Sequence, residues 1–311
     1  MISHSDGVDL SIIVVSWNTR NLLQRCLNSV YAVPDRVQRE VIVVDNGSTD
    51  GSTRMVRGEF PRVRLIENIQ NAGFARANNQ GFVRGAGRYL LMLNPDTEVR
   101  PRALATLVAF MDSHPDAGAA GAMLLNADGT PQTSCYPEPT LFREFWRLFH
   151  LDALWPRACY PMASWPLEAP RQVEVAQGAC LILRRDALSS VGLLDEDYFI
   201  YSEEVDLCHR MRRAGWRVYW VPQAAVVHHG GRSTCQVAGA MFLRLYEGKV
   251  LFFRKHRGQV ATQLYKLILF VASIARLSLG PLILLEDDSR RRRHLNLAGH
   301  YWRLVQALPR L

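Results

Sequence analysis

Three carboxylates lie close together late in the chain, at Glu203, Glu204 and Asp206. They fall at the start of a helix expected over about 203–214, where the positive end of the helix dipole stabilises negative charge. Helix capping and this dipole would explain any one of them. Three like charges beside the aromatic stretch 198–201 do more, because charge crowding and aromatic burial raise the pKa of one carboxyl group toward that of a useful general base. The cluster therefore predicts a general base.

A carboxylate and an imidazole form a second pair of candidates. Asp96 closely follows the apolar run Leu90–Leu93, so it is expected just beyond a central strand, where hard oxygen ligands can hold a divalent cation that bridges a nucleotide diphosphate. A helix N-cap or turn is the structural alternative for Asp96. His228 follows a strand expected over 217–227 and comes one helix and one strand after the acidic cluster, which favours a metal-ligand role. The motif Asp195–Asp197 precedes an aromatic loop and is interpreted as mainly structural.

Several motifs that bind phosphates or carry a nucleophile are absent from the sequence. It has no glycine-rich dinucleotide fingerprint, no P-loop and no Gly-x-Ser-x-Gly elbow. What remains is a set of acidic and Asn-rich strand ends without a glycine cradle. We therefore expect a divalent cation, Mg²⁺ or Mn²⁺, to neutralise any diphosphate.

Short apolar runs alternate with helical patterns through the first half of the chain, which predicts an α/β fold, a doubly wound and mostly parallel sheet. The expected strands are Leu10–Trp17, Val41–Asp45, Val63–Glu67 and Tyr89–Leu93, and the expected helices are Asn21–Tyr31, Phe74–Arg84 and Ala103–Asp112. Ligands of such sheets bind at the carboxyl ends of the strands. This rule singles out Trp17-Asn18, Asp45-Asn46 and Asn94-Pro95-Asp96.

The pattern is less regular in the second half. Residues 126–172 are rich in Pro, Trp and Tyr and predict long loops with a short amphipathic segment at 141–151. Regular structure is expected again over 174–183, as a short helix at 186–191, and as a strand at 217–221 after the helix of the acidic cluster.

Charge divides the chain at about residue 235. Residues 1–235 contain 24 basic and 25 acidic residues, whereas residues 236–311 contain 13 basic and 4 acidic residues. We therefore expect a main α/β domain over 1–235 and a basic, helical segment over 236–311. The basic excess is confined to that segment, so no nucleic-acid surface is expected on the main domain.

Two nine-residue apolar runs lie in the basic segment, Leu267–Ala275 and Leu277–Leu285, separated by Arg276. Neither reaches the length of a transmembrane helix. Packing on the main domain or in an oligomer interface is one explanation, and a monotopic anchor on an anionic membrane surface is the other. The cations expected on the lipid headgroups are Lys249, Arg254, Lys255, Arg257 and Arg290–Arg293.

Six motifs together resemble the inverting glycosyltransferases of family 2, which have the GT-A fold, and most closely the bacterial rhamnosyltransferase subgroup. They occur in the expected order over about 11–235. The motifs are Ser11–Asn18, Val41–Gly51, Glu67–Ala75 followed by Asn78-Asn79, Leu93–Thr97, Gly178–Leu183 and Tyr201–Cys208.

The resemblance implies a set of donor-binding residues. Those expected to hold the nucleotide base and ribose are Trp17, Asn18 and Asp45. Those expected to line the nucleotide-sugar pocket are Asn71, Gly73, Phe74, Asn79 and Asn94.

The resemblance also implies the metal ligands and the base. Asp96 stands where the metal-binding Asp-x-Asp motif of the family ends, with Asn94 in place of the first Asp. His228 resembles an additional metal ligand of several relatives. Glu204 stands where the family usually has the Asp of a Glu-Asp pair, the general base, and Glu203 is the neighbouring candidate.

The function implied is inverting transfer of a sugar, with L-rhamnose from dTDP-L-rhamnose as the favoured donor and a lipid-linked glycan, such as one on polyprenyl diphosphate, or a cell-surface glycan as the acceptor. The base removes a proton from the acceptor hydroxyl while the cation neutralises the leaving diphosphate. A UDP-hexose or UDP-galactofuranose donor is the alternative, and a non-catalytic glycan- or nucleotide-binding module is the rival from another class. Cysteines without a CxxC pair and an N-terminus without a leader pattern favour the cytoplasm or the inner face of the cell membrane.

Overall fold

The computed structural model describes residues 7–32, 36–230, 238–278 and 288–311, and from 288 to 296 the backbone alone. The chain forms two compact units, which we describe separately. The first comprises residues up to Glu138, Pro161–Phe199 and Glu203–Gln236, and the second comprises Pro139–Tyr160, Ile200–Ser202 and Val237–Leu311. The second unit therefore includes the segment after Glu138 as well as the C-terminal part of the chain.

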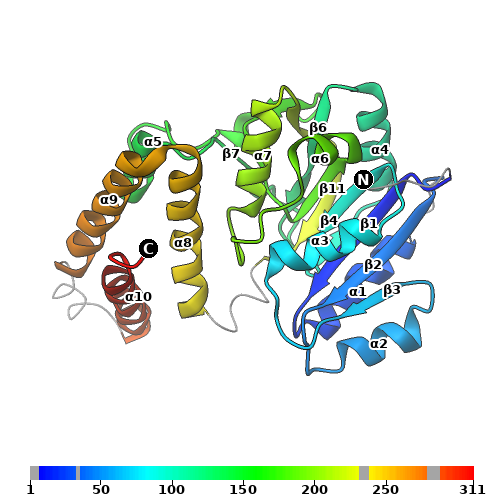
Figure 1. Ribbon diagram of the computed structural model, residues 1–311, viewed down its shortest axis with the longest axis horizontal. Helices are drawn as coiled ribbons and strands as arrows, with labels where there is room; N and C mark the ends of the chain where they lie inside the picture. Colours follow the sequence, from blue (N-terminus) through cyan, green and yellow to red (C-terminus); the bar gives the residue numbers. More distant parts are fainter. Residues whose placement is uncertain (1–6, 33–35, 231–237, 279–287) are drawn as a thin grey trace. The chain divides into compact units, whose positions relative to one another are not determined.

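The first unit is built on a nine-stranded sheet with the order β3-β2-β1-β4-β10-β6-β11-β5, and β8 pairs with β11 (Figure 1). Its strands are β1 (Leu10–Ser16), β2 (Arg39–Asp45), β3 (Arg64–Glu67), β4 (Tyr89–Leu93), β5 (Thr97–Val99), β6 (Ala117–Leu125), β8 (Arg171–Val173), β10 (Cys180–Arg184) and β11 (Arg217–His228). A separate two-stranded sheet pairs β7 (Cys135–Tyr136) with β9 (Val175–Ala176).

Most of the large sheet is parallel, as the alternating pattern predicts. β3, β2, β1 and β4 run parallel to one another, and β6 runs parallel to β11. β10 lies between β4 and β6 and is antiparallel to both, so the sheet is mixed. The chain leaves β1 toward β2 on one side and later returns to β4 on its other side, which is the switch point where such sheets bind ligands.

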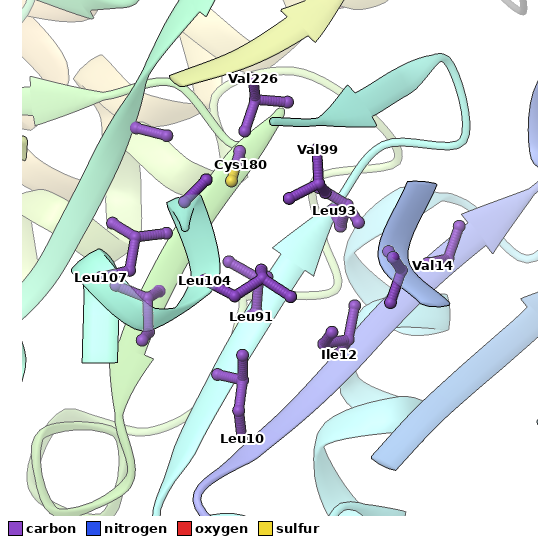
Figure 2. Close-up of a cluster of buried hydrophobic side chains, with 14 of the residues drawn as sticks. Leu10, Ile12, Val14, Leu91, Leu93, Val99, Leu104, Leu107, Cys180 and Val226 are labelled. Carbon is purple, nitrogen blue, oxygen red and sulfur yellow. The ribbon is translucent and has the colours of Figure 1, made fainter. Parts of the chain in front are cut away.

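Helices cover both faces of the sheet. Those of the first unit are α1 (Arg20–Ala32), α2 (Ser52–Glu59), α3 (Phe74–Arg84), α4 (Ala103–Ser113), α6 (Arg185–Val191) and α7 (Glu203–Arg213), with a short 3-10 turn at Met162–Ser164. Figure 2 shows one apolar layer, in which Leu10, Ile12 and Val14 of β1 lie with Leu104 and Leu107 of α4. Alternate side chains of a strand point to opposite faces. On the other face α3 packs so closely that a Cβ at Gly81 would lie 2.5 Å from Cγ2 of Ile13.

Four elements of the first unit differ from the sequence-based expectation or are less regular than it. β6, α2 and β5 are not marked by β-branched runs or clear helical periodicity, and none of the three was expected. The strand expected over 217–221, or as far as 227, is β11 (Arg217–His228), and it continues past Pro222 through a register shift between Val221 and Ala225. The irregularity accommodates the proline, which cannot donate a ladder hydrogen bond, and it carries the strand on to His228.

The second unit is helical. Its elements are α5 (Leu141–Leu148), the 3-10 helix η1 (Leu151–Ala153), α8 (Ala238–His256), α9 (Gly258–Ser278) and α10 (Asp288–Ala307). Buried side chains of α8, α9 and α10 form its core with Leu148 of α5. Among the described helices, α9 is long and apolar enough to cross a membrane by length and composition, a test that core helices of soluble proteins also pass. The apolar run Leu277–Leu285 lies largely outside the described residues.

Candidate active site

The carboxyl ends of β1 and β2 bring the first group of candidates together. The two strands pair in parallel with Ser16 opposite Asp45, so the residues after each strand share one edge. Asn18 has a left-handed backbone (φ 51°), its Oδ1 accepts a hydrogen bond of 2.8 Å from the Thr49 amide, and its own amide donates to Ser48 Oγ at 2.9 Å. These bonds tie the turn after β2 to the residues after β1, and half-buried Trp17 precedes Asn18.

Asp45 carries an unused acceptor at this edge. The residue is buried, and its Oδ2 accepts a hydrogen bond of 2.9 Å from the Ser48 amide. Its other oxygen, Oδ1, is buried without a hydrogen-bond partner among the described residues. Because a buried acceptor without a partner is costly, Oδ1 suits a hydroxyl or N–H donor of a bound nucleotide.

Asn46 organises the loop that precedes α3. Its Nδ2 donates to Asn71 Oδ1 at 3.2 Å and to the Gly73 carbonyl at 3.1 Å, while its Oδ1 accepts from Asn68 Nδ2 at 2.9 Å. Asn71 Oδ1 also accepts from the Gly73 amide at 3.0 Å. The side-chain oxygen of Asn71 is therefore used to shape the loop. Asn46, which the strand-end rule singled out together with Asp45, organises this loop through its side chain.

Gly73 allows this loop to approach the chain before α7. Its φ is 89°, and a Cβ there would lie 2.7 Å from the Phe199 carbonyl oxygen. The same carbonyl accepts a 2.6 Å hydrogen bond from the Phe74 amide. Only glycine satisfies both the backbone conformation and the close approach, so Gly73 and Phe74 lie beside the segment that leads to the acidic cluster.

Asn79 is placed differently from the other expected pocket residues. Its Nδ2 donates to the Leu194 carbonyl at 2.8 Å and to Glu196 Oε1 at 3.0 Å, and its Oδ1 accepts from the Leu194 amide at 3.1 Å. These contacts fasten α3 to the loop after α6. The structure therefore gives Asn79 a scaffolding role, and contact with a nucleotide sugar stays a prediction.

Asp96 and His228 face each other, with 3.5 Å between Asp96 Oδ1 and His228 Nε2, and both are buried. The pairing of β5 with β11 sets His228 opposite Thr97, and the His229 amide donates to the Asp96 carbonyl at 2.9 Å. Gln132 orients the imidazole through its other nitrogen. His228 Nδ1 lies 3.0 Å from Gln132 Oε1, and Gln132 Nε2 donates to the His228 carbonyl at 2.7 Å.

Gln132 fixes the tautomer of His228. The Gln132 Nε2 also donates to Asn126 Oδ1 at 2.8 Å, which orients the amide so that its Oε1 accepts from Nδ1–H of the imidazole. The lone pair of Nε2 then points toward Asp96. This is the arrangement of a histidine that binds a metal ion while its other nitrogen donates to a second group, so the donor set fits a divalent cation. Gln132 lies in the loop-rich stretch 126–172, where no pattern in the sequence marked it.

Asn94 contributes another buried acceptor next to Asp96. Its backbone amide donates to the Ala179 carbonyl at 2.9 Å, and its carbonyl accepts from Thr97 Oγ1 at 2.6 Å. Its side-chain Oδ1 is buried and has no hydrogen-bond partner in the described chain. The residue that replaces the first Asp of the Asp-x-Asp motif is thus held by its backbone and offers an oxygen to a ligand.

The acidic cluster lies at the start of α7 and packs on Gly178, close in sequence to the residue whose carbonyl accepts from the Asn94 amide. A Cβ at Gly178 would lie 3.7 Å from Cβ of Glu204, so the stem of Glu204 lies over Gly178, the neighbour of Ala179. Glu203 is buried, and its Oε2 has no hydrogen-bond partner within the described residues. Burial and the adjacent charge of Glu204 raise the pKa of Glu203 well above its ordinary value.

Asp206 has a supporting role. Its Oδ2 accepts a 2.7 Å hydrogen bond from Nε of Arg210, and Arg210 also donates to the carbonyls of Val191 and Leu193 at 2.6 and 2.8 Å. The ion pair lies within α7, and the Arg210 guanidinium that it orients fastens this helix to the end of α6 and the loop after it. Glu203 and Glu204 are therefore the two members of the cluster that remain candidates for the general base.

The turn before Glu203 is unusual. Tyr201 and Ser202 both have left-handed backbones, with φ of 70° and 71°. A non-glycine residue pays about 1 kcal/mol or more for this conformation. Within the second unit, Gly248 of α8 packs so closely that a Cβ there would lie 2.7 Å from the Tyr201 carbonyl oxygen.

The mixed, mostly parallel sheet with flanking helices, which carries the candidate residues at its strand ends, has the architecture of the GT-A glycosyltransferases. The Glycosyl transferase family 2 model matches residues 11–162, and the Glycosyl transferase family group 2 model matches residues 89–287. The chain belongs to glycosyltransferase family 2 and is a hexosyltransferase-type enzyme.

One relative and two solved structures sharpen the comparison. The chain is 34% identical over 239 residues to the N-acetylglucosaminyl-diphospho-decaprenol L-rhamnosyltransferase of Mycobacterium tuberculosis. The aligned region covers 72% of this chain and 77% of that protein. The mannosyltransferase of Pyrobaculum calidifontis, in complex with GDP-Man and Mn²⁺, has a TM-score of 0.58 at 18% identity and covers 99% of this chain and 89% of that one. GalNAc-T7 with UDP, GalNAc and Mn²⁺ has a TM-score of 0.56 at 18% identity and covers 72% of this chain and 44% of that one. The two structures establish the fold.

Proposed function

We propose that this glycosyltransferase moves L-rhamnose from dTDP-L-rhamnose, with inversion, to a glycan acceptor carried on a polyprenyl diphosphate. The observation that supports the reaction is the pair formed by the Asp96 carboxylate and His228 Nε2, which are 3.5 Å apart at the ends of the strands. The stem of Glu204 packs on Gly178, which precedes a strand of the same sheet. The choice of rhamnose and of a lipid-linked acceptor rests on the 34% identical relative, whose name states both.

The nucleotide is assigned to the ends of β1 and β2. Asp45 Oδ1 is the acceptor available to a ribose hydroxyl or to an N–H of the base, and Asn18 is pre-arranged by its bonds to the turn after β2. Trp17 is available to contact the base. The loop at Asn71–Phe74 follows the next strand and is assigned to the sugar end of the donor.

Asp96 and His228 would hold the divalent cation, Mg²⁺ or Mn²⁺. When bound, the cation neutralises the charge of the leaving diphosphate. No group of three or more His, Cys, Asp or Glu side chains is placed to hold a metal among the described residues, so the chain would supply two ligands and the diphosphate and water the others. Asn94 Oδ1 is the further oxygen at this place. The Mn²⁺ in two structures of the same fold supports the assignment.

Glu204 is assigned as the general base. The raised pKa of Glu203 favours its protonated form, and a proton on Glu203 leaves the negative charge of the pair to Glu204. Glu203 is buried, whereas Glu204 is only partly so, and a base must reach the acceptor hydroxyl. Glu204 therefore accepts the proton, and neutral Glu203 beside it avoids two adjacent buried charges.

The favoured location is the cytoplasm, at the inner face of the cell membrane, where a nucleotide-sugar donor and a lipid-linked acceptor can meet. The acceptor chemistry supports this, since the sugar must be added to a molecule held in the membrane.

The test is a panel of nucleotide sugars offered to the purified full-length protein with Mg²⁺ or Mn²⁺. Thermal shift reports binding, and mass spectrometry reports transfer to a short-chain polyprenyl-diphosphate glycan. We expect dTDP-rhamnose and dTDP to protect the protein best and dTDP-rhamnose alone to give product. Preferential protection and transfer with UDP-hexose or UDP-galactofuranose would replace the donor assignment.

A further inference from the structure

The helix α9 has two apolar faces, and only one is covered. Tyr265, Leu269 and Ala272 are buried against α8, α10 and Leu148 of α5. Six large apolar side chains on the rest of the helix are 38–76% exposed, namely Val260, Leu264, Leu267, Phe270, Val271 and Ile274.

The exposed side chains form one stripe. Val260, Leu264, Leu267, Val271 and Ile274 follow each other at alternating steps of four and three residues, which places them along one side of a helix. At 1.5 Å per residue the stripe is about 21 Å long. Single exposed apolar residues are common on proteins, but a continuous apolar surface indicates an interaction site. We call these five residues with Phe270 the α9 stripe.

The charge around the α9 stripe has one sign. From Gly248 to Ser278 the sequence contains no Asp or Glu. Arg254 and Lys255 at the end of α8 and Arg257 in the turn after it are exposed just before the stripe begins. A partner for this surface must therefore offer apolar contact and negative charge together.

Charge complementarity decides among the candidate occupants. A second copy of the chain has the same stripe, but it brings the same cations and no carboxylate from this region to meet them. A membrane-spanning orientation would need the opposite face of α9 to leave the core around Tyr265 and Leu269. An anionic bilayer surface offers both apolar chains and negative headgroups to a helix that keeps its buried face.

We propose that the α9 stripe lies in the headgroup region of an anionic phospholipid leaflet, with the helix axis along the surface and with Arg254, Lys255 and Arg257 on the headgroups. The proposal rests on the proposed function to the extent that a lipid-linked acceptor requires a membrane. It changes the expected set of cations, since the Lys249 side chain is only 14% exposed and is held in an ion pair with Glu144, 2.7 Å from Nζ to Oε2, so we do not expect it to reach lipid. The side chains of Arg290–Arg293 lie outside the described residues.

The test is flotation of the full-length protein with vesicles of phosphatidylglycerol and phosphatidylcholine, compared with phosphatidylcholine alone. The decisive variant replaces Leu267 and Val271 with Gln, which suits an exposed helix. The matched control is Val83→Gln on α3, an equally exposed apolar residue far from this helix in sequence. We expect the wild type and the control to float with anionic vesicles and the double variant to partition at least about tenfold more weakly, a change of about 1.4 kcal/mol. Equal melting temperatures confirm that all three are folded.

A second variant, with Arg254 and Arg257 replaced by Gln, should lose only the salt-sensitive part of the binding. Wild-type protein that stays in the soluble fraction with anionic vesicles at low salt would overturn the proposal, and so would undiminished flotation of the Leu267 and Val271 variant. A wild-type dimer that this variant converts to a monomer, without vesicle binding, would assign the stripe to a second copy instead.

The two proposals fail separately in the same preparation. Transfer of rhamnose to a short-chain, water-soluble acceptor requires no vesicle. Transfer without flotation would overturn the assignment of the α9 stripe and leave the proposed function standing. Flotation without transfer from any nucleotide sugar would do the reverse.

Discussion

Two buried glutamates, Glu203 of the first unit and Glu144 of the second, show opposite responses to similar burial. Burial and the neighbouring Glu204 raise the pKa of Glu203. Burial would also raise the pKa of Glu144, but the charges of Lys249 and Arg147 outweigh it and hold that pKa below its ordinary value. The sign of the nearest charge, not the depth of burial, decides which carboxyl group stays ionised.

We interpret the contrast as one between a proposed catalytic pair and an ion pair that stabilises the fold. Glu144 accepts from Lys249 Nζ at 2.7 Å, from Arg147 at 3.2 Å and from the Tyr265 hydroxyl at 3.4 Å, so both its oxygens are used. Glu203 leaves Oε2 without a hydrogen-bond partner among the described residues. A carboxylate with every bond made has nothing left to offer a substrate, whereas an incompletely satisfied pair can exchange a proton.

Removal of Asp96 should have the largest effect on activity. Asp96→Ala takes away one of the two protein ligands assigned to the cation, and we expect transfer to fall by at least about 10³-fold with the fold intact. Excess EDTA should inactivate the wild type in the same way. Rates measured with Mn²⁺ and with EDTA check this, and full activity in excess EDTA would remove the cation from the account.

Removal of Glu144 should affect stability instead of chemistry. Glu144→Gln leaves Lys249 buried without its counter-charge, so the free energy of unfolding should fall by about 3–5 kcal/mol. Urea unfolding measures this loss. The double variant with Lys249→Met, which removes the stranded charge, should recover part of it. A stable Glu144→Gln variant that has lost transfer would break the distinction between the two glutamates.

Loss of the Gln132 contact should weaken the cation site without abolishing it. Gln132→Leu removes the acceptor that fixes the His228 tautomer, and such partners contribute about 10–100-fold in metal affinity. We expect the Mn²⁺ concentration for half-maximal activity to rise by that factor while the maximal rate at saturating Mn²⁺ changes little. An unchanged Mn²⁺ requirement would show that His228 needs no second contact or is not a ligand.

The pH dependence of stability should distinguish the two glutamates most finely. The pKa of Glu203 is raised in the folded protein, so its contribution is present at low pH and is lost as pH rises from about 4.5 through the folded value. Glu203→Gln should therefore stabilise the protein at neutral pH, because the amide has no proton to lose. Glu144, with a lowered pKa, contributes above its unfolded pKa and loses this as pH falls. Unfolding of wild type and Glu203→Gln from pH 4 to 8 measures the difference, and parallel curves would contradict it.

The sequence predicts the strands that carry apolar runs and misses strands that do not, such as β6. β1 and β2 are read from β-branched runs and β4 from a run of Tyr, Leu and Met. β6 is rich in Ala and Gly, which have low strand propensity, and its small residues reflect tertiary packing: a Cβ at Gly118 would lie 2.8 Å from Cβ of Trp216, and one at Gly121 would lie 2.8 Å from Cβ of Ala176. Nothing local in the sequence reveals a neighbour that close.

The sequence predicts those candidate residues that stand at strand ends. It does not predict those whose position depends on contact with a distant loop. Asp45, Asn94 and Asp96 stand at strand ends, so the topology alone brings them together. The contact of Gln132 with His228 spans 96 residues and has no local signature. Asn79 lies in a recognisable motif, yet its side chain donates hydrogen bonds to Leu194 and Glu196. The motif does not predict these partners.

We propose that Glu204 accepts the proton while Glu203 remains neutral, and the rates of two single variants distinguish these roles. Single-turnover transfer from dTDP-rhamnose to a lipid-linked acceptor is measured for Glu204→Gln and Glu203→Gln, with donor affinity measured separately. We expect the transfer rate of Glu204→Gln to be lower by about 10²–10⁴-fold at unchanged donor affinity. The transfer rate of Glu203→Gln should fall much less. A crippled Glu203→Gln beside a mild Glu204→Gln would assign the base to Glu203, and wild-type rates for both would contradict base catalysis by this pair.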